Sequence, residues 1–247
     1  MGKKVLFVGE SWTATVTEIK GFNTFGASKY ETGLGWIDKA IEHAGYEFVY
    51  MPSHVANEHF PFSLQEIQDY SCIVLSDIGA DTILMPTETF SASKKYPNRC
   101  QLIKDYVLKG GALLMIGGYM TFNGIGGQGK WWATPVQDVL PVELLTCDDR
   151  IENCEGVTPD IVDPTHPVMR GIEAPWPAVL GYNKSIIKPD AELVATICGD
   201  PFIAFGTYGE GKTAVFSTDC SPHWAPPEFC NWKYYDLLFK NILDYII

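Results

Sequence analysis

A chain of 247 residues, of which 46% are hydrophobic and 19% charged, can bury one large core, and these values exclude an intrinsically disordered protein. The net charge of −12 argues against a nucleic-acid partner, because binding to phosphates needs clustered Lys and Arg. Seven scattered cysteines are an odd number, which favours reduced thiols over a disulfide framework.

The first apolar run, residues 5–8, is too short for the core of a secretory signal. No other stretch approaches the length needed to span a membrane. We therefore expect a cytoplasmic protein that forms a single domain over residues 1–247 and has no membrane partner.

The first part of the chain alternates between predicted strands and a helix. Residues 4–8 form a short apolar run that predicts a buried parallel strand. Residues 29–44 carry apolar positions at helical spacing and end at a glycine, which predicts a crossover helix. Residues 46–51 and 72–75 follow as the second and third strands.

The next elements continue this alternation. Pro97 is suited to the first turn of a helix, and Gly110-Gly111 marks its end. Residues 112–116 then form a fourth strand. Because strands and helices alternate, we expect an α/β fold, a three-layer α/β/α sandwich with a mostly parallel central sheet.

The second half of the chain is less regular. Prolines interrupt residues 117–190, which predicts long loops. Residues 192–198, 202–208 and 213–217 are predicted strands, and the last two flank Gly209-Glu210-Gly211, a hairpin signal. Residues 232–246 carry the apolar stripe of an amphipathic helix.

The motif with most chemical content is a helix end, a strand and two glycines before a polar side chain, running from Gly110 to Tyr119. This pattern presents a residue on a tight turn above a sheet. Together with the segments 134–141 and 219–224, it resembles the class I glutamine amidotransferase-like superfamily. More narrowly, nearly the whole chain is similar to an uncharacterised bacterial family labelled putative glutamine amidotransferase. The resemblance implies a flavodoxin-like α/β/α sandwich.

In amidotransferases of this class, the residue at the turn is a cysteine, because glutamine hydrolysis proceeds through a thioester. Here the matching residue is Tyr119. A phenol titrates near ~10 and is a poor nucleophile at neutral pH. The resemblance therefore predicts a protein without glutaminase activity. Tyr119 has either a packing role or a ligand-contacting role.

The family also uses a late His-x-Glu pair as base and orienting carboxylate. His223 matches the base, but Ala225 stands where the acid belongs. Asp219 could orient the imidazole instead. Cys220 is either a displaced nucleophile stabilised by this histidine or a buried, unreactive cysteine. No second Cys/His pair completes a zinc site, so we expect no metal.

Ligands of open α/β sheets bind at the carboxyl ends of the strands. In a related branch of small chaperone-like hydrolases, a glutamate after the first strand lies beside the turn residue, and Glu10 matches it. The residues expected to converge on this rim are Glu10, Ser11, Asp77, Gly118, Tyr119, Asp219 and His223. The glycine-rich stretches lack the Gly-Lys-Ser/Thr of a phosphate loop, so we expect no cofactor.

Three hypotheses remain from the sequence. The first is an amidotransferase-like protein that binds an unknown small molecule or protein partner at this rim. The second is a hydrolase or amidotransferase that uses Cys220 or an activated water, with His223 as base and Glu10 or Asp219 in support. The third is a subunit of a homo-oligomer.

Overall fold

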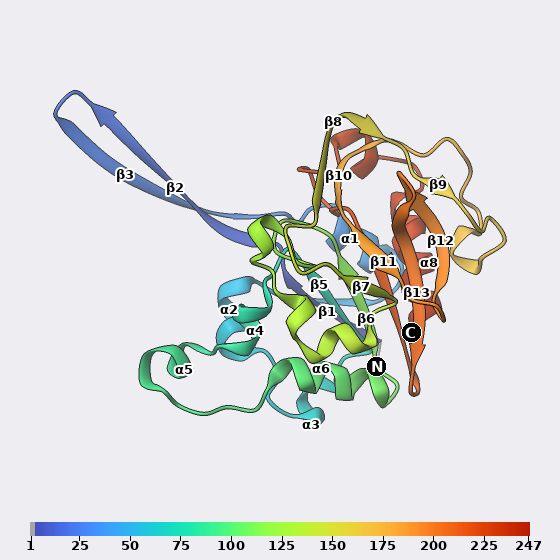
Figure 1. The fold of residues 1–247 in the computed structure, drawn as a ribbon, viewed down its shortest axis with the longest axis horizontal. Helices are drawn as coiled ribbons and strands as arrows, with labels where there is room; N and C mark the ends of the chain where they lie inside the picture. Colours follow the sequence, from blue (N-terminus) through green and yellow to red (C-terminus); the bar gives the residue numbers. More distant parts are fainter. Residues whose placement is uncertain (1–2) are drawn as a thin grey trace.

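The computed structural model describes residues 3–247, so the first two residues of the expected domain lie outside the described residues. The chain forms a mixed α/β fold around an eight-stranded sheet (Figure 1). In spatial order its strands are β4 (Glu47–Met51), β1 (Lys4–Gly9), β5 (Cys72–Ser76), β6 (Ala112–Ile116), β14 (Gly211–Phe216), β13 (Asp200–Tyr208), β12 (Glu192–Ile197) and β9 (Asp160–Ile161). The first five run parallel to one another, and the last three pair antiparallel.

The predicted central strands are confirmed. Every residue of β5 and β6 is buried, and so is every residue of β1 after Lys4. Parallel strands covered on both faces need such continuous apolar runs, which is why the sequence identifies them. The predicted hairpin is also confirmed, because β13 and β14 pair through a turn in which Gly209 has a φ of +60°.

Two apolar clusters lie on opposite faces of the sheet, because neighbouring side chains of a strand alternate between faces. Leu114 belongs to the cluster that packs against α1 (Ile37–His43) and α8 (Tyr235–Ile246). Leu113 belongs to the other cluster, which packs against α2 (Ser53–His59), α3 (Leu64–Ile67), α4 (Ala80–Leu84) and α6 (Arg99–Leu108). The short helices α5 (Thr87–Ala92) and α7 (Pro227–Cys230) complete the set. Along residues 3–247, no helix is both long and apolar enough to cross a membrane.

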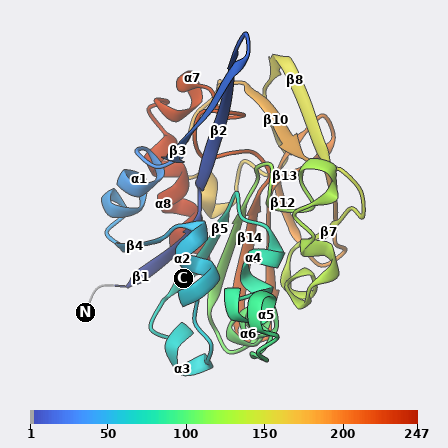
Figure 2. The ribbon, with the colours of Figure 1, turned by 90° about the vertical axis from the view of Figure 1, so that its left-hand side faces the viewer.

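The predicted helix over residues 29–44 is wrong in its first part. Only α1 is helical, while β2 (Ser11–Lys20) and β3 (Asn23–Thr32) form a two-stranded ribbon that projects from the body (Figures 1 and 2). Threonine alternates with other residues along β2, and Gly21 turns the chain at a φ of +65°. These are strand and hairpin signals that the helical spacing further along the chain obscured.

The irregular region 117–190 contains more structure than the loops predicted for it. Two ribbons lie within it, β8 (Arg150–Val157) with β10 (Val179–Asn183) and β7 (Val142–Leu144) with β11 (Ser185–Ile187). Four turns of 3-10 helix accompany them, namely η1 (Ile125–Gly127), η2 (Trp131–Ala133), η3 (Pro135–Val139) and η4 (Pro167–Met169). These strands are short or bulged, so the alternation in their sequences is weak.

Arg99 is fully buried and joins α6 to two neighbouring helices. Its guanidinium donates hydrogen bonds to the carbonyls of Ala56, Asn57 and Phe60 at the end of α2 and of Thr82 and Ile83 in α4. The last carbonyls of a helix lack partners within it and carry partial negative charge, so a cation can satisfy both helix ends at once. Burial lowers the pKa of the guanidinium to about 10.

We predict that Arg99→Met lowers the free energy of unfolding by at least ~2 kcal/mol, because it leaves several buried carbonyls without donors. The stability of Arg99→Lys should lie between those of the wild type and Arg99→Met, since an ammonium reaches fewer of the carbonyls. Urea unfolding followed by circular dichroism measures this loss, with Arg170→Met at an exposed arginine as the control. Equal stability of the two Met variants would contradict the role given to Arg99.

Candidate active site at the strand ends

Glu10 and Asp77 directly follow the neighbouring strands β1 and β5, and both have strained backbones. Their φ angles are +47° and +42°, a region that residues other than glycine rarely adopt. The backbone N–H of Glu10 donates to the carbonyl of Ser76 at 2.9 Å, which holds the two strand ends together. Such strain persists where the surroundings impose it and is frequent at functional sites.

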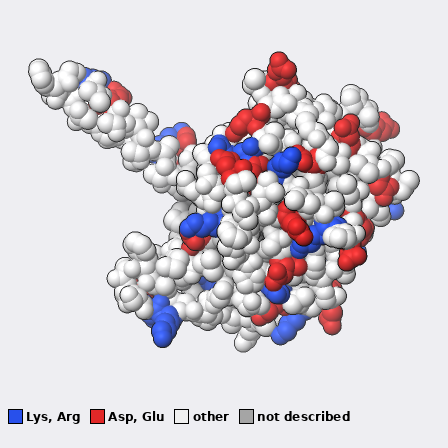
Figure 3. Space-filling view, viewed as in Figure 1, with Lys and Arg blue, Asp and Glu red and all other residues white. Residues whose placement is uncertain are grey.

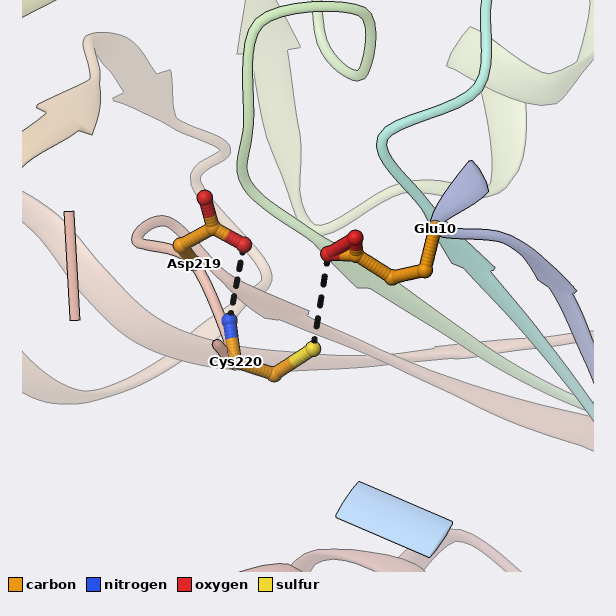
Figure 4. Close-up of side chains that lie close together, drawn as sticks. All are labelled: Glu10, Asp219 and Cys220. Carbon is orange, nitrogen blue, oxygen red and sulfur yellow. Dashed lines mark hydrogen bonds between the residues drawn. The ribbon is translucent and has the colours of Figure 1, made fainter. Parts of the chain in front are cut away.

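The carboxyl of Glu10 lies in a buried cluster with Asp219 and Cys220 (Figure 4). One potential ligand atom from each of the three side chains lies within 4.8 Å of the others. The thiol of Cys220 is 3.7 Å from Glu10 Oε1, and Ser76 Oγ donates to the same oxygen at 3.3 Å. Gly33 is required opposite this carboxyl, because an added Cβ would lie 2.7 Å from Glu10 Oε2.

Two buried carboxyls in one cluster cannot both ionise at low cost. Burial raises the pKa of Glu10 well above its usual value, and the charges of Asp219 and Asp77 raise it further. Burial and Asp77 raise the pKa of Asp219 to about 7, while a hydrogen bond with Glu10 acts in the opposite direction. Glu10 therefore holds its proton more strongly than Asp219 does. A cation bound here would have to displace that proton.

Cys220 is fully buried next to these carboxyls. Burial raises the pKa of its thiol well above the usual value, and Glu10 and Asp219 add to the effect. A reactive cysteine needs positive charge nearby to stabilise the thiolate. The surroundings of Cys220 carry negative charge instead, so the thiol is neutral at physiological pH.

His223 lies above this cluster with 40% of its side chain exposed. Its Nδ1 is 3.3 Å from Asp219 Oδ2, the partner that the sequence offered in place of the missing acid. The ring of Tyr119 meets the imidazole edge to face, with centroids 4.2 Å apart. The imidazole is thus positioned by a carboxylate below and an aromatic ring at its side.

The side chain of Tyr119 is held by polar and charged neighbours. Its hydroxyl donates to Glu152 Oε1 at 3.1 Å, and the guanidinium of Arg150 lies 4.9 Å from its ring centroid. Glu152 also accepts a hydrogen bond from Trp224 Nε1 at 2.9 Å. Partial burial and Glu152 raise the pKa of the phenol. The hydroxyl is therefore a hydrogen-bond donor and is not activated as a nucleophile.

The two glycines before Tyr119 are required by close packing. A Cβ on Gly117 would lie 2.3 Å from the carbonyl of Ser217, and one on Gly118 would lie 3.0 Å from Asp77 Oδ1. Asn183 receives a hydrogen bond from Gly118 N and donates one back to Gly118 O. This exchange fixes the turn that follows β6.

Asn183 in turn donates to buried Asp149, whose carboxylate also accepts the backbone N–H groups of Asn123 and Gly124. Asp149 therefore organises the glycine-rich loop after the turn. Sequence reasoning missed Asn183 and Asp149, because they lie in irregular segments with no motif around them.

A pocket of about 500 Å³ opens above the carboxyls. It is lined by Glu10, Trp12, Asp77, Tyr119, Met120, Ile125, Asp219, Ser221, Pro222 and His223. Five of the side chains that the sequence suggested thus share one pocket. Cys220 and Gly118 are not among its lining residues, and the hydroxyl of Ser11 accepts a hydrogen bond from Ser53 N at 2.8 Å. Trp12 was missed because the ribbon that carries it was not predicted.

Solved structures similar to this chain include two from Salmonella typhimurium. The cytoplasmic protein STM3548 is 44% identical, with 98% of each chain covered and a TM-score of 0.95. The cytoplasmic protein STM1381 is 40% identical, covering 98% of this chain and 99% of that one, with a TM-score of 0.94.

A putative ThuA-like protein from Bacteroides uniformis shares the fold alone, at 10% identity and a TM-score of 0.52, with 97% of this chain and 89% of that one covered. The comparison with curated proteins gives no match. The family described as putative glutamine amidotransferase matches residues 4–247, nearly the whole described chain. The chain therefore belongs to the putative glutamine amidotransferase family.

Proposed function

We propose that this protein binds a small neutral or cationic ligand at the strand ends and has no glutaminase activity. The observation that supports this most is the composition of the pocket. The carboxyls of Glu10, Asp77 and Asp219 lie on one side, and the rings of Trp12 and Tyr119 supply apolar walls. Such a pocket suits a ligand with an apolar, ring-sized part and hydroxyl or amino groups.

The position of the pocket supports ligand binding. In chain order, the five parallel strands β1, β4, β5, β6 and β14 are arranged spatially as 2-1-3-4-5. In sheets of this order, ligands bind where the order reverses, between the first and third strands. Glu10 follows the first strand, and Asp77 follows the third. We infer from this order a flavodoxin-like, three-layer α/β/α sandwich that forms one domain.

The charge of the pocket argues against anionic ligands. Glu10 holds its proton while Asp219 ionises near pH 7, so the pair carries up to one negative charge at and above neutral pH, and Asp77 lies beside it. The positive charge of Arg150 is already paired with Asp148 at 2.8 Å. A carboxylate in the pocket would lose hydration without gaining a free cation.

The absence of glutaminase activity follows from the side chains around the turn. Thioester chemistry requires a thiolate at the pocket wall beside a base. Tyr119 occupies that wall, and the nearest thiol, that of Cys220, is buried among carboxyls that keep it neutral.

A second candidate function is hydrolysis by an activated water. Asp219 has a pKa of about 7, and its Oδ2 lies 3.3 Å from His223 Nδ1. A general acid or base works best when its pKa is close to the working pH. In this reaction, His223 would take a proton from water, and Asp219 would stabilise the resulting imidazolium.

We also propose a cytoplasmic location. The two Salmonella proteins at 44% and 40% identity are both described as cytoplasmic.

The ligand class is testable with three ring compounds that differ in charge: benzylamine, benzyl alcohol and benzoate. We predict that saturation-transfer NMR detects binding of the first two, and that benzoate binds at least ~10-fold more weakly, a difference of about 1.4 kcal/mol. Asp77→Asn should reduce the preference for benzylamine over benzyl alcohol, because it removes a charge from the pocket.

The matched control is Asp163→Asn, a partly exposed carboxylate outside the pocket, which should leave all three affinities unchanged. Tighter binding of benzoate than of benzylamine would contradict the proposed ligand class. Release of ammonia from glutamine by the wild-type protein would contradict the absence of glutaminase activity.

The state of Cys220 is testable by alkylation. We predict that iodoacetamide near neutral pH labels the exposed Cys147, Cys154 and Cys198, and leaves Cys220 at least ~100-fold slower, because a buried neutral thiol reacts poorly. Mass spectrometry of peptides measures the order, and labelling in guanidinium confirms that all seven cysteines can react. If Cys220 reacted first, the displaced-nucleophile hypothesis would replace the present proposal.

The raised pKa of Asp219 predicts a pH dependence of stability. The pKa of Asp219 is raised on folding, from 3.8 to about 7, so the folded state binds a proton that the unfolded state lacks between these values. The stability contributed by this group is complete below pH ~4 and is lost as pH rises toward ~7. Asp219→Asn removes this loss.

We therefore expect the free energy of unfolding of Asp219→Asn, relative to wild type, to rise by a few kcal/mol between pH ~5 and ~8. Urea unfolding at several pH values measures the difference. Glu228→Gln, at an exposed carboxyl, is the control and should show no such trend. A difference that is constant with pH would mean that Asp219 is ionised throughout.

A further inference from the structure

The ribbon of residues 11–32, which we call the arm, is the part of the molecule that the proposed site does not explain. Its ten paired residues on each strand carry it away from the body (Figures 1 and 2). Large apolar side chains on it face solvent: Val16 is 59% exposed, Ile19 73%, and Phe22 at the tip is fully exposed. In the space-filling view the arm is mostly free of charged groups (Figure 3).

The pairing of β2 with β3 determines what each face of the arm carries, since directly paired residues point to the same side. One face, which we call the apolar face, carries Trp12, Ala14, Val16, Phe25 and Ala27, and the arm's four charged residues, Glu18, Lys20, Lys29 and Glu31, lie on the same face. The opposite face carries Ile19 and is rich in hydroxyls from Thr13, Thr15, Thr17, Thr24 and Ser28. On that second face, near the base, the Tyr30 ring packs against His54 of α2 with centroids 5.3 Å apart.

A two-stranded ribbon alone is at best marginally stable in water. Cross-strand contacts within the arm are modest, such as the 3.1 Å hydrogen bond between the hydroxyls of Thr15 and Ser28. The apolar face beyond Trp12 therefore lacks the cover that an extended ribbon needs. A partner that packs on the apolar face would supply this cover.

We propose that the partner is a second copy of this chain, and that the two arms pack against each other through their apolar faces. A symmetric pair of this kind needs one self-complementary surface, which is how most homodimers form. Val16 and Phe25 provide its centre, and Phe22 at the tip reaches toward the base of the other arm.

The charges of the arm suit self-association. Its four charged residues are Glu18, Lys20, Lys29 and Glu31, which cancel, while the whole chain carries −12. These residues also neutralise one another locally, in the pairs Glu18 with Lys20 at 3.1 Å and Lys29 with Glu31 at 2.7 Å. The negatively charged bodies of two copies repel each other, whereas their neutral arms do not. A neutral arm also offers no attraction to a polyanion.

The exposed area is sufficient for a dimer. Large side chains of this kind cover ~150–250 Å² each, so the exposed parts of Trp12, Val16, Phe22 and Phe25 expose roughly 500 Å² in one copy. Two copies would bury about 1,000 Å² from these side chains alone, the lower limit for a specific interface. The alanines and the stems of Lys20 and Lys29 would add to this area.

The contact would begin next to the pocket, because Trp12 belongs both to the apolar face and to the pocket wall. The dimer nevertheless depends on the arm and not on the pocket. Loss of ligand binding and loss of dimerisation are therefore separate outcomes.

Sedimentation equilibrium of the full chain tests the proposal. We expect a dimer at about 10 µM protein, and Val16→Glu should raise the dissociation constant at least ~100-fold by burying a charge in the interface. The matched control is Thr17→Glu, the next residue on β2, whose side chain points to the hydroxyl-rich face. It should remain a dimer.

A shortened arm gives an independent measurement. Trp12 and Glu31 are directly paired, so Asn-Gly can replace residues 13–30 as a two-residue hairpin turn. This variant should be a monomer whose circular dichroism and cooperative unfolding match a folded body.

Three results would overturn the proposal: a monomeric wild type at about 100 µM, a dimer that survives shortening of the arm, or equal disruption by both glutamate variants. Flotation of monomeric wild type with phosphatidylcholine and phosphatidylserine vesicles would instead assign the apolar face to a lipid surface.

Discussion

The burial of the Glu10 and Asp219 carboxyls side by side is the constraint on which the rest of the site depends. Both carboxyls are buried at strand ends, and their mutual repulsion prevents simultaneous ionisation. The remaining negative charge is placed at Asp219, where it can orient His223. The same carboxyls keep Cys220 neutral and leave the pocket suited to neutral and cationic groups. One electrostatic arrangement thus underlies the position of His223, the neutral thiol of Cys220 and the proposed ligand preference.

The backbone conformation that places these carboxyls is strained. Glu10 and Asp77 both adopt positive φ angles, and glycines at positions 33 and 118 leave room for their carboxyls. Conformations of this kind cost of order 1–3 kcal/mol each. Fully buried strands on both sides offset that cost, since β1 and β5 belong to the most completely buried part of the sheet. A rigid sheet therefore holds a strained and acidic edge.

The central strands, helix α6 and the turn before Tyr119 could be predicted from the sequence, because their signals are local: continuous apolar runs, a proline near the helix start and paired glycines. Pro97 does not lie in the first turn as expected, since the helix begins at Arg99 and is capped by the side chain of Asn98. The arm could not be predicted, because its strands do not pack against the hydrophobic core. The apolar spacing of the following helix also dominated the pattern in this part of the sequence. The carboxyl pair was only partly accessible. Glu10 and Asp219 were both candidates, but 209 positions separate them, and nothing local indicates that their carboxyls lie in one buried cluster.

Tyr119 stands where the resemblance to class I amidotransferases predicts a cysteine, and the chemistry of the whole site differs with it. A cysteine at this position would face Asp77 and Asp219, whose negative charge disfavours a thiolate. Without the hydroxyl of Tyr119, Glu152 would also lose a hydrogen-bond donor and keep only Trp224 and the nearby Arg150. Replacing Tyr119 by cysteine would therefore not create a nucleophilic thiolate. The side chain at the turn and the charge of the pocket are matched to each other, which supports the proposed ligand binding over acyl transfer.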